Sequence, residues 1–295
     1  MQSLGQLLTA MVTPFDADLR VDYGRAAELA ARLLAQGNDG LVVSGTTGES
    51  PTLSDEEKLQ LFRVVKEAAG EAPVLAGTGS NDFEHTVHFS RQAAATGVDA
   101  LLIVGPYYNK PSQEGYFQHF SRLAAAVDLP LIIYNIPGRT GSNITAETQL
   151  RLAHACPGIV GAKEGSGDLA QISAICAGAP EGFSVWSGDD AITLPVMAVG
   201  GVGVISVVGH VVAEELREMV EAYHTGSIRE AAAIHQRLLP LFRAAFQPSG
   251  NPACVKRMLQ VCGFDCGGLR LPLVEASPAD TEEIVRVCKE LGIAV

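Results

Sequence analysis

A lysine stands at the end of a short apolar run near the middle of the chain. Residues 159–162 are Ile-Val-Gly-Ala, and Lys163 follows them directly. Moving an ammonium group out of water is costly, so this side chain either extends its charged end to solvent or places its amine in a site. In apolar surroundings the pKa of the amine falls, and a neutral amine can attack a ketone to form a Schiff base. A solvent-reaching or ion-paired lysine is the alternative.

Two further side chains could share a site with this lysine. Tyr134 lies near the end of the preceding apolar run, PLIIYNI (130–136), and Arg139 follows five residues later in YNIPGRTG. A phenol can relay protons when a second hydroxyl supports it, and a guanidinium in a loop can bind a carboxylate. The alternatives are a packed tyrosine with a capped hydroxyl and a solvated arginine.

Glycine-rich segments are the next candidates, as anion-binding loops. GTTGES (45–50) lacks the Lys-Ser or Lys-Thr ending of a P-loop, and neither GSGD (165–168) nor GGVG (200–203) has the spacing of a dinucleotide-binding loop. Within the first of these segments, Thr46 and Thr47 instead offer two adjacent hydroxyls, together with backbone N–H groups, to a carboxylate.

The histidines do not form a metal-binding pattern. His85 and His88 are close in sequence, but no third ligand is placed beside them, and the other five histidines are scattered. We therefore expect no metal and no bound cofactor. Carbon–carbon chemistry beside a carbonyl needs an electron sink, and a lysine imine can provide one without either.

The elements that must position these residues alternate along the chain. Uniformly apolar runs, as expected for strands covered on both faces, are separated by segments with helical spacing. Helix caps are expected at Asp22, Ser54, Thr145 and either Ser80 or Asn81. The expected strands are 7–13, 40–45, 73–79, 99–105, 130–136, 158–164, 183–188 and 201–206.

Eight strands alternating with helices favour an α/β fold, a (β/α)8 TIM barrel, over an open doubly wound sheet. We expect the barrel to occupy residues 1–225 and a C-terminal helical domain to occupy residues 226–295. In such a barrel the chemistry lies where the strands end. Those ends carry Thr13, residues 45–47, Gly77, Thr78, residues 106–108, Tyr134, Asn135, Lys163, Glu164, Ser187, Gly188, Ile205 and Ser206.

Composition excludes several classes of partner. The 295 residues carry a formal net charge of −12, which argues against nucleic acid and anionic membranes. No stretch is long and apolar enough for a membrane helix, and residues 1–15 lack the features of a signal peptide. The six cysteines form no CxxC pair, so we interpret them as reduced thiols. We expect a cytoplasmic protein that binds small molecules.

Four motifs in order resemble the dihydrodipicolinate synthase / N-acetylneuraminate lyase family over nearly the whole chain. They are GTTGES (45–50), PYYNKPSQEG (106–115), YNIPGRTG (134–141) and GAKEGSGD (161–168), each at an expected strand end. The resemblance implies a TIM barrel with C-terminal helices and Schiff-base chemistry on pyruvate. The paired threonines and Arg139 are similar to the dihydrodipicolinate synthase branch, which condenses pyruvate with L-aspartate 4-semialdehyde in diaminopimelate and lysine biosynthesis.

The resemblance also implies the catalytic roles. Lys163 would form the imine with pyruvate, and Tyr134 would move protons through Thr46 to Tyr108, which reaches across from a neighbouring subunit. The implied assembly is a homotetramer made of two tight dimers.

The same resemblance implies how substrates are bound. Thr47 would hold the pyruvate carboxylate and Arg139 the carboxylate of the aldehyde. Gly188 and Ile205 would line the pocket with their backbone. Two other functions stay open: a sister aldolase or dehydratase acting on another 2-oxo acid, and a catalytically silent homologue.

One departure concerns regulation. Lysine-inhibited members of the family carry two histidines and a glutamate around a pocket at the dimer interface. Here Asp55 and Lys58 stand where the histidines would align, and His85 lies near the position of the glutamate, whereas Ser50, Asn81 and Tyr107 match. The resemblance therefore implies weak or absent inhibition by L-lysine.

Overall fold

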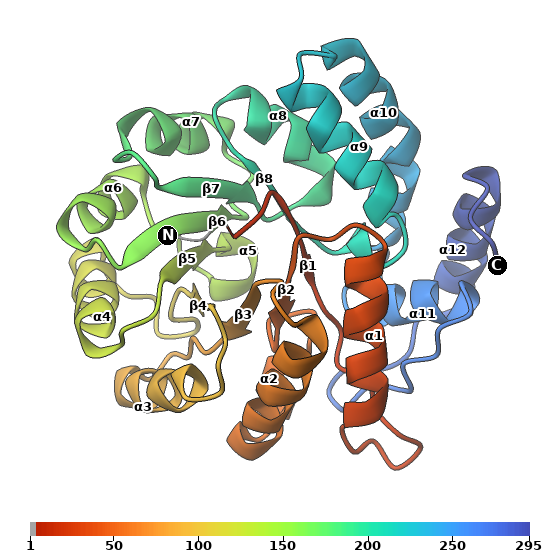
Figure 1. Ribbon diagram of the computed structural model, residues 1–295, viewed down its shortest axis with the longest axis horizontal. Coiled ribbons are helices and arrows are strands. Elements are labelled where there is room, and N and C mark those ends of the chain that lie inside the picture. Colours follow the sequence, from red (N-terminus) through yellow and green to blue (C-terminus); the bar gives the residue numbers. More distant parts are fainter. Residues whose placement is uncertain (1–3) are drawn as a thin grey trace.

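Eight parallel strands close into a barrel with helices around it (Figure 1). This computed structural model describes residues 4–295, so the first three residues of the segment examined for a signal peptide lie outside it. The strands follow one another in chain order, and β8 pairs with β1. The strands are β1 (Leu7–Ala10), β2 (Gly40–Val43), β3 (Val74–Gly77), β4 (Ala100–Val104), β5 (Leu131–Asn135), β6 (Ile159–Glu164), β7 (Ser184–Ser187) and β8 (Gly203–Ser206).

This closed barrel confirms the predicted fold and excludes the open doubly wound sheet. Each of the eight expected runs contains one strand, but most runs are longer than their strands. In the first run, for example, Met11 and Val12 are buried although pairing in β1 ends at Ala10. Apolar character indicates burial, and burial continues into the loops at the barrel mouth.

At least one helix follows each strand. These helices are α1 (Tyr23–Ala35), α2 (Asp55–Ala69), α3 (Phe83–Ala94), α4 (Gln113–Ala126), α5 (Pro137–Thr140), α6 (Ala146–Ala155), α7 (Leu169–Gly178), α8 (Thr193–Ala198) and α9 (Ala213–His224). Residues 4–295 also contain three short 3₁₀ turns, η1 (Ser50–Thr52), η2 (Asp190–Ile192) and η3 (Val208–His210). No helix among the described residues is long and apolar enough to cross a membrane.

The helix caps follow the sequence with one exception. Ser54 forms a capping box with Glu57 at the start of α2, and Asp22 and Thr145 cap α1 and α6. The prediction of Ser80 or Asn81 as the cap of α3 is wrong. Asp82 caps that helix, because its carboxylate accepts a hydrogen bond from the backbone of the third helical residue at 2.7 Å.

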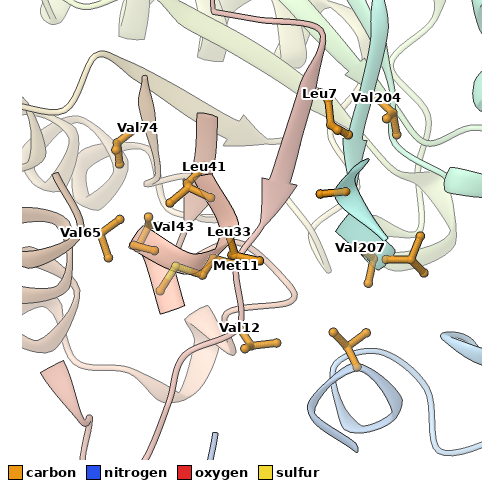
Figure 2. Close-up of a cluster of buried hydrophobic side chains, with 14 of the residues drawn as sticks. Leu7, Met11, Val12, Leu33, Leu41, Val43, Val65, Val74, Val204 and Val207 are labelled. Atoms are coloured by element: carbon orange, nitrogen blue, oxygen red, sulfur yellow. The ribbon is translucent and has the colours of Figure 1, made fainter. Parts of the chain in front are cut away.

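Side chains alternate between two apolar layers along each strand. Leu41 and Val43 of β2 pack outward against helices, whereas Val42 between them points into the barrel. Figure 2 shows part of the outer layer, where side chains of β1, β2, β3 and β8 meet those of α1 and α2. The inner layer fills the barrel with residues such as Leu102, Ile132 and Trp186. The barrel is therefore a packed core, open to chemistry only at its mouth.

Three further helices follow the barrel. They are α10 (Ile228–Ala244), α11 (Ala253–Val261) and α12 (Pro278–Glu290). In Figure 1, α10 lies beside α9, and α11 and α12 lie beyond α1. The Arg25 guanidinium of α1 packs over the Phe264 ring at 3.9 Å, which ties the segment after α11 to the barrel. The boundary proposed at residues 225 and 226 falls in the turn between α9 and α10, and the division into two domains stays a prediction.

Candidate active site

Lys163 points into the barrel at the end of β6. Its neighbour Ala162 belongs to the outer apolar layer, so the alternation of the strand sends the lysine inward. The residue is buried, with 4% of its surface exposed. Burial lowers the pKa of Lys163 to about 8, while Asp190 nearby raises it and Arg139 lowers it further. The alternative of a solvent-reaching lysine is therefore excluded.

Tyr134 stands beside this lysine on the adjacent strand β5. The two residues are paired in the register of β5 and β6, and Lys163 Nζ lies 4.5 Å from the centre of the Tyr134 ring. Burial raises the pKa of Tyr134 to about 12, which Arg139 and a hydrogen bond with Thr46 partly offset and Asp189 increases. The phenol therefore keeps its proton at neutral pH, beside a hydroxyl that can take part in a relay.

Lys163 lines a narrow cavity that opens into a larger cleft. The inner cavity has a volume of about 40 Å³, and the cleft a volume of about 500 Å³. Thr46, Tyr134, Arg139 and Asn251 line both, so the cleft leads to the amine. A small substrate in the cleft is thus brought close to the amine, among both polar and apolar side chains.

Two hydroxyls enter the site from the loop after β2. Thr46 and Thr47 both line the inner cavity. The segment after β1 holds this loop, because the Thr13 hydroxyl donates a hydrogen bond to the Gly48 carbonyl at 2.7 Å. Thr47 is buried, and its hydroxyl accepts a hydrogen bond from the Asn251 side-chain amide at 2.9 Å.

Arg139, on the one-turn helix α5, lines the same inner cavity. Pro137 begins that turn two residues after the last residue of β5, which places the guanidinium at the mouth. Its Nη2 donates a hydrogen bond to the Asn251 backbone carbonyl at 3.3 Å. Asn251 therefore contacts both Thr47 and Arg139, although it comes from the C-terminal part of the chain.

A buried ion pair is a second link between the barrel and the C-terminal helices, in addition to Asn251. Lys256 Nζ of α11 lies 2.8 Å from Glu49 Oε1 in the loop after β2, and both side chains are almost fully buried. The ammonium also donates to the Gly268 carbonyl at 2.7 Å. The C-terminal helices thus help to hold the loop that carries Thr46 and Thr47.

The remaining site residues predicted from the sequence lie in different places. Gly188 lines the inner cavity after β7, where a Cβ atom would come within 3.0 Å of the Glu164 carbonyl. Ile205 packs in the inner apolar layer and does not line the cavity, whereas Val207, two residues later, does. Tyr108 is 90% exposed, away from both cavities, with a backbone φ of 73°.

Several residues at the site escaped the sequence analysis. Asn251 and Phe246 line the inner cavity from beyond the barrel, and Asp190 is buried between β7 and β8, where it accepts a hydrogen bond from the backbone of Val207 at 2.9 Å. Asp190 follows the end of the expected strand 183–188 by only two residues, so its nearness to a strand end was the signal for it in the sequence. Among residues 4–295, no group of three or more His, Cys, Asp or Glu side chains is placed to hold a metal ion.

Comparison with known proteins gives a consistent result. A protein from Symbiobacterium thermophilum named 4-hydroxy-tetrahydrodipicolinate synthase is 54% identical, over 99% of this chain and 100% of its own length. A crystal structure of the Cyanidioschyzon merolae dihydrodipicolinate synthase with lysine bound superposes with a TM-score of 0.96, at 43% identity, covering 98% and 99% of the two chains.

An enzyme with bound pyruvate has the same fold. The chloride-inhibited dihydrodipicolinate synthase from Acinetobacter baumannii, complexed with pyruvate, superposes with a TM-score of 0.95 at 35% identity, covering 99% of this chain and all of its own. The sequence profile of the dihydrodipicolinate synthetase family matches residues 3–291. With a closed barrel, a buried lysine at its mouth and relatives matched along their full length, this chain belongs to the dihydrodipicolinate synthetase family.

Proposed function

We propose that this chain condenses pyruvate with L-aspartate 4-semialdehyde to give 4-hydroxy-tetrahydrodipicolinate, the first committed step of diaminopimelate and lysine biosynthesis. The observation that carries the proposal is the buried amine of Lys163 beside the Tyr134 phenol, in a cavity that opens to solvent. The full-length relatives named 4-hydroxy-tetrahydrodipicolinate synthase support the choice of substrates.

The first step is imine formation. The neutral Lys163 amine attacks the keto carbon of pyruvate, a C–N bond forms, and the keto oxygen leaves as water. The protonated nitrogen then draws electrons from the methyl group, which loses a proton to give an enamine. The lowered pKa of Lys163 supports this step, because a larger share of the amine is neutral near physiological pH.

Tyr134 serves the proton transfers. The amine lies 4.5 Å from the centre of its ring, and the phenol's hydrogen bond with Thr46 supports a relay that continues to Tyr108 of a neighbouring subunit. Because the pKa of Tyr134 is about 12, the phenol acts by passing a proton on as it receives one, and a resting phenolate is not required.

The second substrate completes the reaction. The enamine carbon attacks the aldehyde carbon, and the aldehyde oxygen becomes a hydroxyl. The substrate's own amine then displaces Lys163 from the imine carbon, so that the ring closes and the lysine is freed. One water is released overall, in the first step, and pyruvate must bind before the aldehyde.

Substrate carboxylates are held at the two sides of the cavity. We assign the pyruvate carboxylate to Thr47 and the aldehyde's carboxylate to Arg139, which can bind it in a bidentate manner. Gly188 and Ile205 line the pocket through their backbone in this proposal. The contacts of Asn251 with both Thr47 and Arg139 support the pairing of these two positions.

We also propose that the enzyme works in the cytoplasm as a homotetramer, a dimer of tight dimers. The exposed Tyr108 ring supports an interface at this surface, because a large aromatic side chain held in a left-handed backbone conformation is costly without a function. The free cysteines are compatible with a reducing compartment.

Borohydride trapping tests the proposal. Reduction in the presence of pyruvate should add one reduced pyruvate to Lys163, as located by peptide mass measurement, and no adduct should form on Lys163→Met. Turnover of L-aspartate 4-semialdehyde should fall by at least about 10³-fold in that variant. An unmodified native chain would favour a silent homologue. An adduct combined with faster turnover of sugar-derived 2-oxo acids would favour a sister aldolase.

A further inference from the structure

A carboxylate is buried directly behind the reactive lysine. Glu164 follows Lys163 in β6, so the alternation of the strand points it outward, away from the cavity. Its side chain is fully buried, and none of the ion pairs formed by residues 4–295 includes it. A buried charge costs several kcal/mol unless hydrogen bonds compensate for it, so its surroundings must hold it closely.

Four neutral donors surround this carboxylate. The side-chain amide of Asn135 donates to Oε1 at 3.0 Å, that of Gln171 donates to the same oxygen at 3.4 Å, and Gln149 donates to it as well. The Ser166 hydroxyl donates to Oε2 at 2.6 Å. These donors come from β5, α6, α7 and the loop after β6. Glu164 is therefore the point at which four segments behind the site are joined.

One of these donors also closes the loop that carries Arg139. Asn135 directly follows Tyr134, and its side-chain oxygen accepts a hydrogen bond from the Ile144 backbone at 3.0 Å. Its amide also donates to Asn143 Oδ1 at 2.8 Å. Segment 136–144, which includes α5, thus forms a loop whose two ends are held together at Asn135.

We propose that Glu164 and Asn135 are positioning residues for the condensation. Through their paired side chains they hold the ends of β5 and β6 together, and with them the relative placement of Tyr134, Lys163 and the Arg139 loop. This inference rests on the proposed function. An error of about 1 Å in such a placement can cost on the order of 10²-fold in rate.

The absence of a cation from this cluster fits the chemistry of the neighbouring site. A lysine or arginine bound to Glu164 would add a positive charge next to Lys163, whose imine with pyruvate is itself a cation. Neutral amides and a hydroxyl hold the carboxylate without that charge. The cluster therefore fixes geometry and adds no positive charge near the protonated imine.

Substitution of Glu164 by glutamine tests the inference. Glu164→Gln keeps the shape but sets a donor amide against the donor amides around it. We expect kcat to fall by about 10- to 100-fold, with imine formation from pyruvate slowed to a similar degree and KM for pyruvate changed far less. Ser166→Ala removes one donor from the edge of the cluster, and we expect a smaller fall in kcat in the same direction.

A buried amide in the turn after α1 provides the matched control. Asn38 lies before β2 and bonds to Thr9, Leu33 and Gly209. Asn38→Ala should lower the melting temperature but leave kcat per folded molecule unchanged, which separates loss of stability from loss of positioning.

The outcomes are distinct. If the native chain forms no imine with pyruvate, the proposed function fails. If the native chain forms it, and folded Glu164→Gln keeps kcat and the imine rate within about twofold, the positioning role is overturned. Should Glu164→Gln not fold, unchanged kinetics in Ser166→Ala would overturn the role instead.

Discussion

Lys163 and Tyr134 are neighbours whose ionisation is displaced in opposite directions by the same cause. Burial lowers the pKa of the amine to about 8 and raises that of the phenol to about 12, so both groups are held toward their neutral forms. The amine gains nucleophilicity near neutral pH, and the phenol keeps the proton that it must pass on. These two groups thus have the different tasks of nucleophile and proton carrier.

The pH dependence of imine formation follows from the lysine. Below a pH of about 8 the Lys163 amine is mostly protonated, and its neutral share grows about tenfold for each unit that the pH rises. We therefore expect the rate of trapping with pyruvate alone to increase with pH and to level off above about 8. Rapid-quench borohydride trapping between neutral and alkaline pH measures this curve.

The variant Arg139→Leu tests whether the midpoint of that pH curve reports the pKa of Lys163. The guanidinium lowers the pKa of Lys163, so its removal should raise this pKa and move the midpoint of the curve to higher pH. A midpoint that stayed in place, or moved to lower pH, would contradict the electrostatic account.

Sequence alone could identify some of these residues and not others. Lys163 and Tyr134 interrupt apolar strands, and a polar group in that setting is conspicuous. Asn251 gave no such signal, because it bonds to Thr47 across 204 residues of sequence. Such a contact depends on how the C-terminal helices dock, and no local pattern encodes that.

At the scale of elements, the loop after β2 depends on α11 for its shape. Glu49 adopts a left-handed backbone conformation there, with a φ of 57°, and its carboxylate reaches inward to Lys256. Its second oxygen accepts a hydrogen bond from the Arg270 backbone at 3.1 Å. The barrel loop that carries Thr46 and Thr47 is thus tied to two points of the C-terminal segment.

Removing only the cation of the Glu49–Lys256 pair should lower the free energy of unfolding more than removing both charges. Lys256→Met leaves the Glu49 carboxylate buried without its cation, and we expect a loss of about 3–5 kcal/mol in the free energy of unfolding. The double variant Glu49→Gln/Lys256→Met should recover part of that loss. Urea denaturation of the two variants and the native chain measures it. Equal destabilisation in both variants would show that the charge pair is not the cause.

The cleft outside the inner cavity bears on regulation. His85 Nε2 lies 2.8 Å from Asp55 Oδ2, and Lys58 Nζ lies 3.7 Å from Asp55 Oδ1. His85, Lys58 and Glu49 line this cleft, and Glu49 is already paired with Lys256. The ammonium groups of a free lysine bound there would lie near the carboxylates of Asp55 and Glu49, which are already paired with cations of the protein.

We therefore expect L-lysine at millimolar concentration to leave the initial rate nearly unchanged. Lys58→His with Asp55→His, which removes both the resident ammonium and the carboxylate that holds it, should increase sensitivity. Steady-state assays with and without L-lysine measure both. Strong inhibition of the native chain would refute the expectation.

The elements themselves were largely predictable, for a physical reason. Strands covered on both faces are apolar throughout, and each of the eight runs marked one of them. Their ends were less clear, since burial continues past the last paired residue, as at Met11. The one-turn helix α5 is too short to show a helical period in the sequence. Arg139 could therefore be placed in the loop after a strand, but not on a helix.

At the scale of the whole molecule, a single chain leaves the proposed proton relay incomplete. Tyr134 and Thr46 are joined inside the barrel, but Tyr108 stands at the surface, 90% exposed. If Tyr108 acts in the relay, it must do so in the site of a second copy. Activity would then require association, and each site would combine residues of two chains.

Mixing two impaired variants tests this arrangement. Lys163→Ala has no amine in its own site but can supply Tyr108, and Tyr108→Phe keeps the amine but supplies no hydroxyl. When the two are unfolded together and refolded, hybrid dimers should contain one site with both groups, so turnover should exceed that of either variant refolded alone. Sedimentation confirms that hybrids form. If Tyr108 acted within its own chain, no hybrid site would combine both groups and turnover would not rise above the sum of the two. A fully active monomer would exclude the shared site altogether.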